Sequence, residues 1–350
     1  MTPTAREETV LAAVRQRRER VNDALAEDLP ITDPERLYEA SRYLLDAGGK
    51  RLRPAILLLV GEALLDVPPL SADYRSFPTL VDDEPPIDLM AEAVSVEVIQ
   101  SFTLIHDDIM DQDEMRRGVP AVHVEYDEET AILAGDTLYS KAFEIMIDTG
   151  APADRAMEAL DTLAETCTRI CEGQSLDVDF ETRADVSTEE YLDMVDRKTA
   201  VLYAAAASIP AILLGADDET VEALAEYGHA IGKAFQIHDD VLDLTVPSED
   251  LGKQRGSDLV EGKQTVITLH ARNHGVDVDG LVDADAPEDV TEAEVEEAVA
   301  VLEEAGSIEY ARSLARDLVA EGKEYLQVLP DNEARLRLEQ VADYLIERGY

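Results

Sequence analysis

The sequence predicts an all-α protein. Over most of its 350 residues, apolar side chains recur every three or four positions, which is the spacing of amphipathic helices. The strict alternation of apolar and polar residues that marks a half-buried strand is nearly absent. Hydrophobic residues make up 45% of the chain, enough for a sizeable core, and the length suits one large domain or two ordinary ones.

Helices are expected wherever this spacing continues between residues that end helices, chiefly glycine and proline. In chain order they cover residues 5–27, 34–46, 52–65, 89–111, 128–148, 153–172, 188–206, 220–243, 264–273, 291–304, 306–328 and 331–348. Two acidic segments break the pattern. Residues 67–88 contain five prolines and a single basic residue and are expected to form an exposed insertion between helices. Residues 275–288 are expected to form a solvated acidic loop.

The charge balance is strongly acidic. The chain has 77 Asp and Glu residues against 30 Lys and Arg, a net charge of −47. A field of this sign repels nucleic acids and anionic membrane surfaces, so neither is an expected partner. Lysine is reduced to seven residues, and acid excess with few lysines indicates adaptation to high salt, where repulsion among surface charges is screened. The sequence therefore suggests a halophilic protein.

Nothing in the chain indicates export or a membrane anchor. Residues 1–20 are charged and contain no apolar stretch of the kind found in signal peptides. The longest apolar run, Val201 to Ala216, is shorter than a typical membrane span and is interrupted by a serine and a proline. Cys167 and Cys171 fit small core residues of a helix better than a metal or redox pair. A soluble, cytoplasmic protein is expected.

A seven-residue motif occurs twice. The sequence Ile-His-Asp-Asp-Ile-Met-Asp at 105–111 returns as Ile-His-Asp-Asp-Val-Leu-Asp at 237–243. On a helix, the first and third aspartates of each copy lie one turn apart on one face, with the second at its flank. Carboxylates bind Mg²⁺, which completes its octahedron with water and substrate phosphates. Two such motifs across a cavity predict a metal-dependent site for a diphosphate, with Asp107, Asp108, Asp111, Asp239, Asp240 and Asp243 as ligands.

In so acidic a chain, a single motif of this kind could be a solvated helix face. Both copies, however, follow directly on apolar runs, Ser101–Ile105 and Ala234–Ile237, and both share the Ile-His that precedes the aspartates. The copies lie in different predicted helices on either side of the middle of the chain, so they form one site only if one fold brings them together. The sequence therefore predicts a single domain over residues 1–350.

Basic residues cluster near these motifs. Gly48-Gly49-Lys50-Arg51-Leu52-Arg53-Pro54 joins two predicted helices and places three cations at a helix start, where they would form an anion site. Further cations follow in Arg116-Arg117, Lys198-Thr199, Gly252-Lys253 and Gly262-Lys263-Gln264-Thr265, and together with Lys50 these stretches hold four of the seven lysines. Taken singly, each of these stretches could simply mark a helix end or form a surface ion pair. Together they indicate basic groups that hold phosphates.

These motifs, in this order, resemble those of the polyprenyl synthetase family, the trans-isoprenyl diphosphate synthases. The resemblance runs from about residue 35 to beyond residue 270 and rests on Gly48–Pro54, Glu97–Pro120, Ala134–Asp136, Gly173–Gln174 with Asp177, Lys198–Thr199, Phe235–Asp243 and the stretch from Gly252 to Thr265. It implies an isoprenoid-synthase-type bundle of antiparallel helices around a central cavity, usually a homodimer.

The resemblance also implies a role for each matching residue. The six aspartates would bind about three Mg²⁺ that bridge to the diphosphate of an allylic substrate. The residues implied for that allylic diphosphate and its pocket are Arg116, Lys198, Thr199, Gln236, Lys253 and Lys263. Those implied for isopentenyl diphosphate are Lys50, Arg53, Gln100 and Arg117. Relatives often carry His at the position of Gln100. The Gln100 side chain can donate a hydrogen bond to a phosphate oxygen, but unlike His it cannot become cationic.

The implied reaction joins isopentenyl diphosphate to dimethylallyl, geranyl or farnesyl diphosphate. Metals and cations stabilise the negative charge that develops as the allylic C–O bond ionises. The double bond of isopentenyl diphosphate then attacks the allylic cation, and a proton leaves to the departing diphosphate. The product is an all-trans chain five carbons longer. No side-chain nucleophile is required, so His106 and His238 are expected to be structural.

Product length is expected to depend on the residues just before the first motif. Phe102 is the nearest bulky residue, and Thr103, four residues before Asp107 on the same helical face, is small. Phe102 without a second aromatic at Thr103 resembles archaeal-type synthases that make the C20 product, geranylgeranyl diphosphate. Products of C15 and C25 stay open, as does the alternative that Phe102 is ordinary core.

Three other classes of protein fit less well. A terpene cyclase usually carries an Asn/Ser/Glu metal motif where this chain repeats the all-Asp form. A non-catalytic subunit of a heteromeric synthase predicts eroded motifs, whereas both copies and their basic partners are intact. A Ca²⁺-binding protein would need loop ligands that end in Glu, and none has that spacing.

Overall fold

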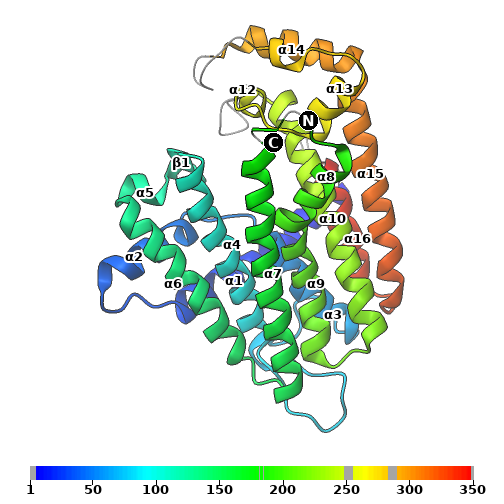
Figure 1. Ribbon diagram of the computed structural model, residues 1–350. Coiled ribbons are helices and arrows are strands. Elements are labelled where there is room, and N and C mark those ends of the chain that lie inside the picture. The colour runs from blue at the N-terminus through cyan, green and yellow to red at the C-terminus, as the bar shows by residue number, and fades with distance from the viewer. Residues whose placement is uncertain (1–4, 181, 184, 248–254, 283–289, 348–350) are drawn as a thin grey trace. The chain divides into compact units, whose positions relative to one another are not determined.

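The computed structural model describes residues 5–180, 182–183, 185–247, 255–282 and 290–347. Apart from one short hairpin and a single bridge between Phe77 and Ile87, these residues form helices and their connections (Figure 1). The predicted all-α fold is confirmed.

The helices and strands follow one another along the chain with short connections. The first half contains α1 (Ala5–Asp28), α2 (Glu35–Asp46), α3 (Leu52–Leu64), a 3₁₀ turn (Tyr74–Ser76), α4 (Leu89–Met110), β1 (Met115–Arg116), β2 (Val119–Pro120), α5 (Val122–Glu125), α6 (Glu128–Ile147) and α7 (Ala153–Phe180). The second half contains α8 (Thr188–Val195), a π-helical turn (Asp196–Ala200), α9 (Val201–Leu214), α10 (Asp218–Thr245), α12 (Ser257–Val260), α13 (Val266–Asn273), 3₁₀ turns (Val278–Gly280 and Leu326–Val328), α14 (Glu292–Glu304), α15 (Ser307–Tyr325) and α16 (Glu333–Glu347).

The chain divides into two compact units. Unit 1 consists of residues 1–167, 205–225 and 326–341, and unit 2 consists of residues 168–204, 226–325 and 342–350. The first aspartate motif therefore belongs to unit 1 and the second to unit 2. The single domain over residues 1–350 stays a prediction.

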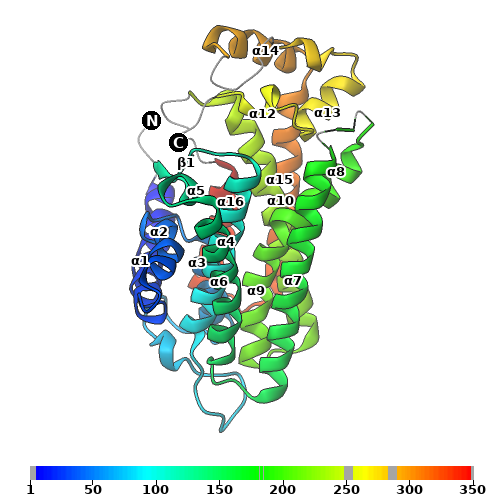
Figure 2. The same ribbon diagram turned by 60° about the vertical axis from the view of Figure 1, so that its left-hand side comes forward.

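The core of unit 1 is built around α4. This helix packs along α6, and α3 packs against both α1 and α4 (Figures 1 and 2). Five consecutive residues of α3, Ile56 to Val60, are fully buried, as expected of a helix that is apolar all round. Ser95 in α4 donates a hydrogen bond of 2.8 Å to the carbonyl of Ala142 in α6. The helix that carries the first motif is thus fixed along its length.

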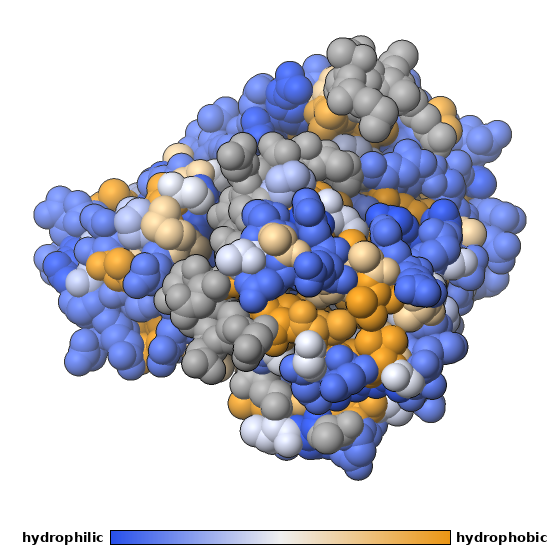
Figure 3. Space-filling view, turned by 90° about the horizontal axis from the view of Figure 1, so that it is seen from above, coloured by the Kyte–Doolittle hydropathy of each residue, from blue (hydrophilic) through white to orange (hydrophobic). Residues whose placement is uncertain are grey.

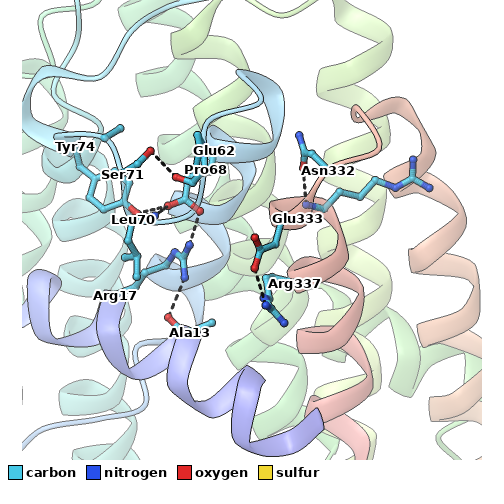
Figure 4. A network of polar contacts seen from close by, with 12 residues as sticks. Ala13, Arg17, Glu62, Pro68, Leu70, Ser71, Tyr74, Asn332, Glu333 and Arg337 are labelled. Atoms are coloured by element: carbon cyan, nitrogen blue, oxygen red, sulfur yellow. Dashed lines mark hydrogen bonds and ion pairs between the residues drawn. The ribbon is translucent and has the colours of Figure 1, made fainter. Parts of the chain in front are cut away.

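The prediction that residues 67–88 form an exposed insertion is wrong for the residues around its buried aromatic side chains. Tyr74, Phe77 and Ile87 are fully buried, and Phe77 and Ile87 exchange backbone hydrogen bonds of 2.7 and 2.9 Å. Figure 4 shows the anchor: the buried carboxylate of Glu62 in α3 accepts from Arg17 of α1 and from the Tyr74 hydroxyl. The prolines and acids of this segment remain at its surface, but its aromatic residues complete the core of unit 1.

In unit 2, glycines allow helices to approach closely around the π-helical turn. A methyl group at Gly173 of α7 would lie 2.3 Å from the backbone nitrogen of Lys198, and one at Gly232 of α10 would lie 2.5 Å from Cα of Ala200. Contacts this short exclude any side chain at either position. The turn is therefore held between two backbones, while α13 packs against α15 and α8.

Most helix ends agree with the prediction to within two residues. The main exceptions are α7, which continues through Gly173 to Phe180, and the helical segment from Thr188, which continues through Pro210 to Leu214. Both glycine and proline were expected to end helices, but the close approach at Gly173 and the buried setting of α9 outweigh these local preferences. The hairpin of β1 and β2 was not predicted.

The predicted loop over residues 275–288 is described as far as residue 282, where most residues other than Val278 are exposed. Residues 283–288 lie outside the described residues. Both cysteines are free, but Cys171 is exposed, so the prediction that it is a core residue is wrong, whereas Cys167 is buried. Hydrophilic residues predominate on the face seen in Figure 3, as the acidic composition predicts.

Candidate active site

The first aspartate motif ends α4 in unit 1. Asp111 follows the last helical residue, and its backbone N–H donates to the carbonyl of Asp107, 2.8 Å away. Asp107 is half-buried and Asp111 is exposed, whereas Asp108 is 0% exposed. The predicted spacing thus places the first and third carboxylates one turn apart and accessible. The second carboxylate points into the protein.

Asp108 is held by Arg116 from the hairpin. The guanidinium donates from Nε to Oδ1 of Asp108 over 2.6 Å, and from NH2 to Oδ2 of Asp113 over 2.7 Å. The turn of the hairpin, in which Arg117 and Gly118 both have positive φ, returns the chain so that Arg116 reaches back to α4. Burial raises the pKa of Asp108 to about 6, although the hydrogen bond and charge of Arg116 oppose it.

The second motif lies near the end of α10 in unit 2. Asp239 is half-buried, whereas Asp240 and Asp243 are buried. Asp240 accepts from the hydroxyl of Tyr191 at 2.5 Å and from Nε2 of Gln236 at 3.1 Å. Burial raises the pKa of the Asp240 carboxyl well above its ordinary range. In both motifs, therefore, the middle aspartate is buried and bound by protein groups, and the first aspartate is more accessible than the middle one.

Asp243 is oriented by the chain that follows α10. Its two carboxylate oxygens accept from the Ser257 hydroxyl at 3.1 Å and from the backbone N–H of Asp258 at 3.2 Å. Lys263, three residues beyond α12, forms ion pairs with Glu261 at 2.7 Å and Asp258 at 3.6 Å. The structure thus brings Asp243 and Lys263 to the same short segment around Asp258. Lys253 lies outside the described residues.

The π-helical turn presents Lys198 and Thr199. Nζ of Lys198 lies 2.5 Å from Oδ2 of Asp177 in α7, and the Thr199 hydroxyl donates to Oε1 of Gln236 over 3.1 Å. Gln236 also contacts Asp240, so these predicted residues of the allylic site form one connected set in unit 2. The set includes Asp177, which sequence reasoning placed in a matching stretch without a role.

Asp196, the first residue of this turn, is a further residue that sequence reasoning missed. It accepts from Arg169 at 2.8 Å and His229 at 2.9 Å, and Lys233 lies 3.6 Å away. Burial raises the pKa of Asp196, but these three cationic or protonatable partners outweigh it, and the net pKa lies below its ordinary value. The cluster borders a cavity of about 420 Å³ within unit 2. No local sequence signal would have found it.

The residues predicted for isopentenyl diphosphate lie on neighbouring elements of unit 1. Lys50 lies two residues before α3, Arg53 is in its first turn, and Gln100 is in α4. Arg117 reaches the glycine turn before Lys50: its NH1 donates to the carbonyls of Leu44, at 3.1 Å, and of Gly48. The structure therefore brings Arg117 to the glycine–lysine segment that the sequence placed in the same site.

Phe102 packs against α6. Its ring centroid lies 4.9 Å from that of His106 and 5.2 Å from that of Tyr139, which in turn lies 5.2 Å from Phe143. Thr103 donates to the carbonyl of Gln100 at 2.9 Å. Phe102 and Thr103 therefore occupy different faces of α4, and Thr103 shares the face of Asp107.

Fold and motifs together define the class of protein. The chain belongs to the polyprenyl synthetase family, which matches residues 34–302. It is 71% identical to a geranylfarnesyl diphosphate synthase of Natronomonas pharaonis, over 97% of this chain and 98% of that protein. It is 52% identical to a geranylgeranyl diphosphate synthase of Methanosarcina mazei, over 98% and 99% of the two chains.

Comparison with a solved structure supports the same family and fold. The geranylgeranyl pyrophosphate synthetase from Geoglobus acetivorans superposes with a TM-score of 0.84 and 42% identity, covering 96% of this chain and 99% of that one. The predicted family and the predicted class of enzyme, a short-chain prenyltransferase, are thereby confirmed.

The residues present fit Mg²⁺. The three aspartates of each motif offer carboxylate oxygens, and Oδ2 of the buried Asp108 has no hydrogen-bond partner among the described residues. Within the part of the chain that the structure describes, no three acidic, His or Cys groups already converge as a complete set of ligands. Such a donor set suits an ion that takes one or two carboxylates and completes its shell with water and substrate phosphates.

Proposed function

We propose that this protein is a Mg²⁺-dependent prenyltransferase that condenses isopentenyl diphosphate with dimethylallyl, geranyl or farnesyl diphosphate. The main product is geranylgeranyl diphosphate, C20. The observation that carries the proposal is the repeated motif: in each copy an accessible first aspartate stands beside a buried second one that protein groups hold in place. Family membership supplies the substrate class.

In this proposal, the residues divide into two phosphate sites. Asp107, Asp108, Asp111, Asp239, Asp240 and Asp243 hold about three Mg²⁺ on the allylic diphosphate, with Arg116, Lys198, Thr199, Gln236, Lys253 and Lys263 around it. Lys50, Arg53, Gln100 and Arg117 hold isopentenyl diphosphate. Bound Mg²⁺ supplies Lewis-acid stabilisation of the departing diphosphate.

The protein's own groups contribute orientation and charge. Tyr191 and Gln236 fix the plane of the Asp240 carboxylate, and Asp177 limits the positions available to the Lys198 ammonium. Such preorganisation means that little rearrangement is needed as the allylic C–O bond breaks. The proton lost after C–C bond formation goes to a diphosphate oxygen, so no side-chain base is needed.

A C25 product is the second candidate. It is favoured by the 71% identity to a protein named geranylfarnesyl diphosphate synthase, whereas the 52% identical relative is named for the C20 product. We propose Phe102 as the residue that decides between them, because its ring borders the aromatic group of Tyr139 and Phe143 five residues before the first metal ligand. Thr103 is the matching small residue on the Asp107 face.

We also propose a homodimer that buries the outer face of α6. Leu133 and Ile147 in α6 are 57% and 58% exposed, and Ile132 and Tyr139 of the same helix are also exposed. Exposed apolar side chains gathered along one helix mark an interaction surface. Leu133→Asp should yield a monomer by light scattering, and a wild-type chain that is already monomeric would contradict the dimer.

A soluble, halophilic and cytoplasmic protein completes the proposal. The segment Thr188–Leu214 has the length and apolar character of a membrane span, but 83% of its apolar window is buried inside the molecule, as in core helices of soluble proteins. The net charge of −47 suits a salt-rich interior.

The direct test is incubation with labelled isopentenyl diphosphate and each allylic primer, with and without Mg²⁺, followed by chromatographic sizing. We expect Mg²⁺-dependent extension that stops at C20. Extension to C25 would select the second candidate, and no extension with any primer would contradict the proposed function.

A further inference from the structure

A buried ion-pair cluster lies behind the segment proposed to bind isopentenyl diphosphate. Arg51, between Lys50 and the first turn of α3, is only 3% exposed although it is an arginine in a loop. Its NH1 forms an ion pair with Glu97 of α4, which is also 3% exposed. Arg51 therefore faces inward, in contrast to the exposed Lys50 that precedes it.

Arg51 is tied to three helices. Besides Glu97, its Nε donates to Oδ1 of Asn22 in α1 over 2.9 Å, and its NH2 donates to the carbonyl of Leu45 in α2 over 2.6 Å. The Arg51 backbone is left-handed, with φ of 52°, at the residue immediately before α3. A non-glycine residue in this region is strained and persists only where its surroundings hold it. Here the contacts of the Arg51 guanidinium with Glu97, Asn22 and the Leu45 carbonyl hold the backbone in this conformation.

The same carboxylate also reaches Arg117. NH2 of Arg117 lies 3.5 Å from Oε1 of Glu97, while its NH1 donates to the carbonyls of Leu44 and Gly48. Arg117 is likewise left-handed, with φ of 54°. Burial lowers its pKa, with the Arg51 charge adding to this and Glu97 opposing it. One buried carboxylate thus balances two arginines from two separate loops.

The cluster fixes the backbone on both sides of the proposed site. The guanidinium of Arg117 lies so close to Gly49 that a methyl group there would be 3.0 Å from Cζ. Lys50 and Arg53 flank Arg51 in the sequence, and Gln100 lies one helical turn after Glu97. Each of the four residues proposed to bind isopentenyl diphosphate therefore lies within three positions of a member of this cluster along the chain, or belongs to it.

We infer that Glu97 is a positioning residue for isopentenyl diphosphate: by binding Arg51 and Arg117 together, it sets the conformation of the Gly48–Arg53 segment and the aim of Arg117. The inference rests on the proposed function. Glu97 does not touch the substrate. It keeps two cations close together before the substrate arrives, so that their mutual repulsion does not oppose binding.

The test compares two buried glutamates of unit 1. Glu97→Gln keeps the shape of the side chain but removes the charge that balances the two arginines. Glu62→Gln is the matched control, because Glu62 is also a buried partner of an arginine, Arg17, but lies near the other end of α3. Both changes should lower the melting temperature, since each breaks a buried ion pair.

Only Glu97→Gln should change substrate use. We expect its KM for isopentenyl diphosphate to rise about tenfold, with the KM for the allylic diphosphate within about twofold of wild type. Glu62→Gln should leave both KM values unchanged. An unchanged KM for isopentenyl diphosphate in folded Glu97→Gln, or an equal rise in Glu62→Gln, would overturn the inference.

A milder variant covers the case in which Glu97→Gln does not fold. Asn22 is exposed and contributes one acceptor to Arg51, so Asn22→Ala should fold and raise the KM for isopentenyl diphosphate about threefold. No rise in Asn22→Ala would count against the inference in that case. The wild-type assay separates the two proposals: an inactive wild type contradicts the proposed function, whereas an active wild type with unaltered variants contradicts only the role of Glu97.

Discussion

Arg116 binds Asp108, the buried second aspartate of the first motif, with 2.6 Å between Nε and Oδ1. A residue proposed to hold the substrate and a residue proposed to hold metal are therefore already joined in the free protein. Burial raises the pKa of Asp108 to about 6 even though the hydrogen bond and charge of Arg116 lower it, and Asp107 and Asp111 are the accessible members of the motif. In the proposed function, the substrate diphosphate would therefore share Arg116 with Asp108.

The accessible aspartates should be essential for turnover. Asp107→Ala and Asp239→Ala each remove a ligand whose effect is greatest as the diphosphate departs, so kcat should fall at least a hundredfold at saturating Mg²⁺. Asp218→Ala, an exposed aspartate at the start of the helix that carries Asp239, is the control and should keep full activity. Circular dichroism checks that helicity is retained. Either site variant with more than about a tenth of wild-type kcat would refute the assignment.

The sequence predicted the fold from local spacing, and it succeeded where helix ends depend on local residues. It failed at residues 67–88, because the burial of Tyr74 and Phe77 depends on Glu62 and Arg17, which lie outside the segment. Proline and acid content describes the segment's surface and says nothing of its partners elsewhere in the chain.

For the candidate site, the residue types were predictable but their environments were not. The two motifs read alike, and spacing placed Asp108 and Asp240 only at the flank of a face. Which aspartate is buried depends on Arg116 and Tyr191, and these reach the motifs through tertiary structure. The proposed role of Glu97 could not be read from sequence for the same reason, since Glu97 lies in α4 and its partner Arg51 lies just before α3.

Product length should respond to the two residues on different faces of α4. Phe102→Ala opens space beside Tyr139 without touching a ligand, so products should lengthen beyond those of wild type. Thr103→Phe places a ring on the Asp107 face and should shorten the product toward C15. Chromatographic sizing measures both.

The control for this pair is Phe77→Leu, a substitution in the core of unit 1 away from the motif. It should lower the melting temperature and leave product length alone. If Phe102→Ala and Thr103→Phe behave in the same way, Phe102 is ordinary core and the chain-length proposal fails, whereas the prenyltransferase class stands.

Stability should depend strongly on salt. With a net charge of −47, repulsion among surface carboxylates destabilises the folded state in dilute buffer and is screened in molar KCl. The melting temperature and the activity should therefore both rise with KCl concentration. A melting temperature that stays flat from dilute buffer to molar salt would contradict the halophilic proposal.

Glu92 should destabilise the protein at neutral pH. It is fully buried in α4, neither carboxylate oxygen has a hydrogen-bond partner among the described residues, and burial raises its pKa well above the ordinary value of 4.5. The folded state keeps the proton after the unfolded chain has lost it. Stability therefore falls as pH rises above about 4.5, by up to about 1.4 kcal/mol per pH unit.

Glu92→Gln removes this ionisation, so it should raise the free energy of unfolding at pH 8 and change it little at pH 4, as measured by denaturant titration. Glu62→Gln should have the opposite sign at pH 8, with a loss of about 3 kcal/mol, because Glu62 is the charged partner of the buried Arg17. Equal effects of Glu92→Gln at both pH values would show that Glu92 is not held neutral.

The π-helical turn at Asp196–Ala200 determines the direction in which the Lys198 side chain points. The N–H of Val201 bonds to the carbonyl of Asp196, five residues back, so this turn holds one residue more than an α-helix would. Deleting one residue here would restore a regular helix and keep its hydrogen bonds. The helices on either side would keep nearly the same phase, because the five residues of the π-helical turn replace four of an α-helix, so the change would fall on the side chains within the turn, Lys198 among them. The direction of a proposed diphosphate ligand is thus encoded in the number of residues in the turn as well as in their identity.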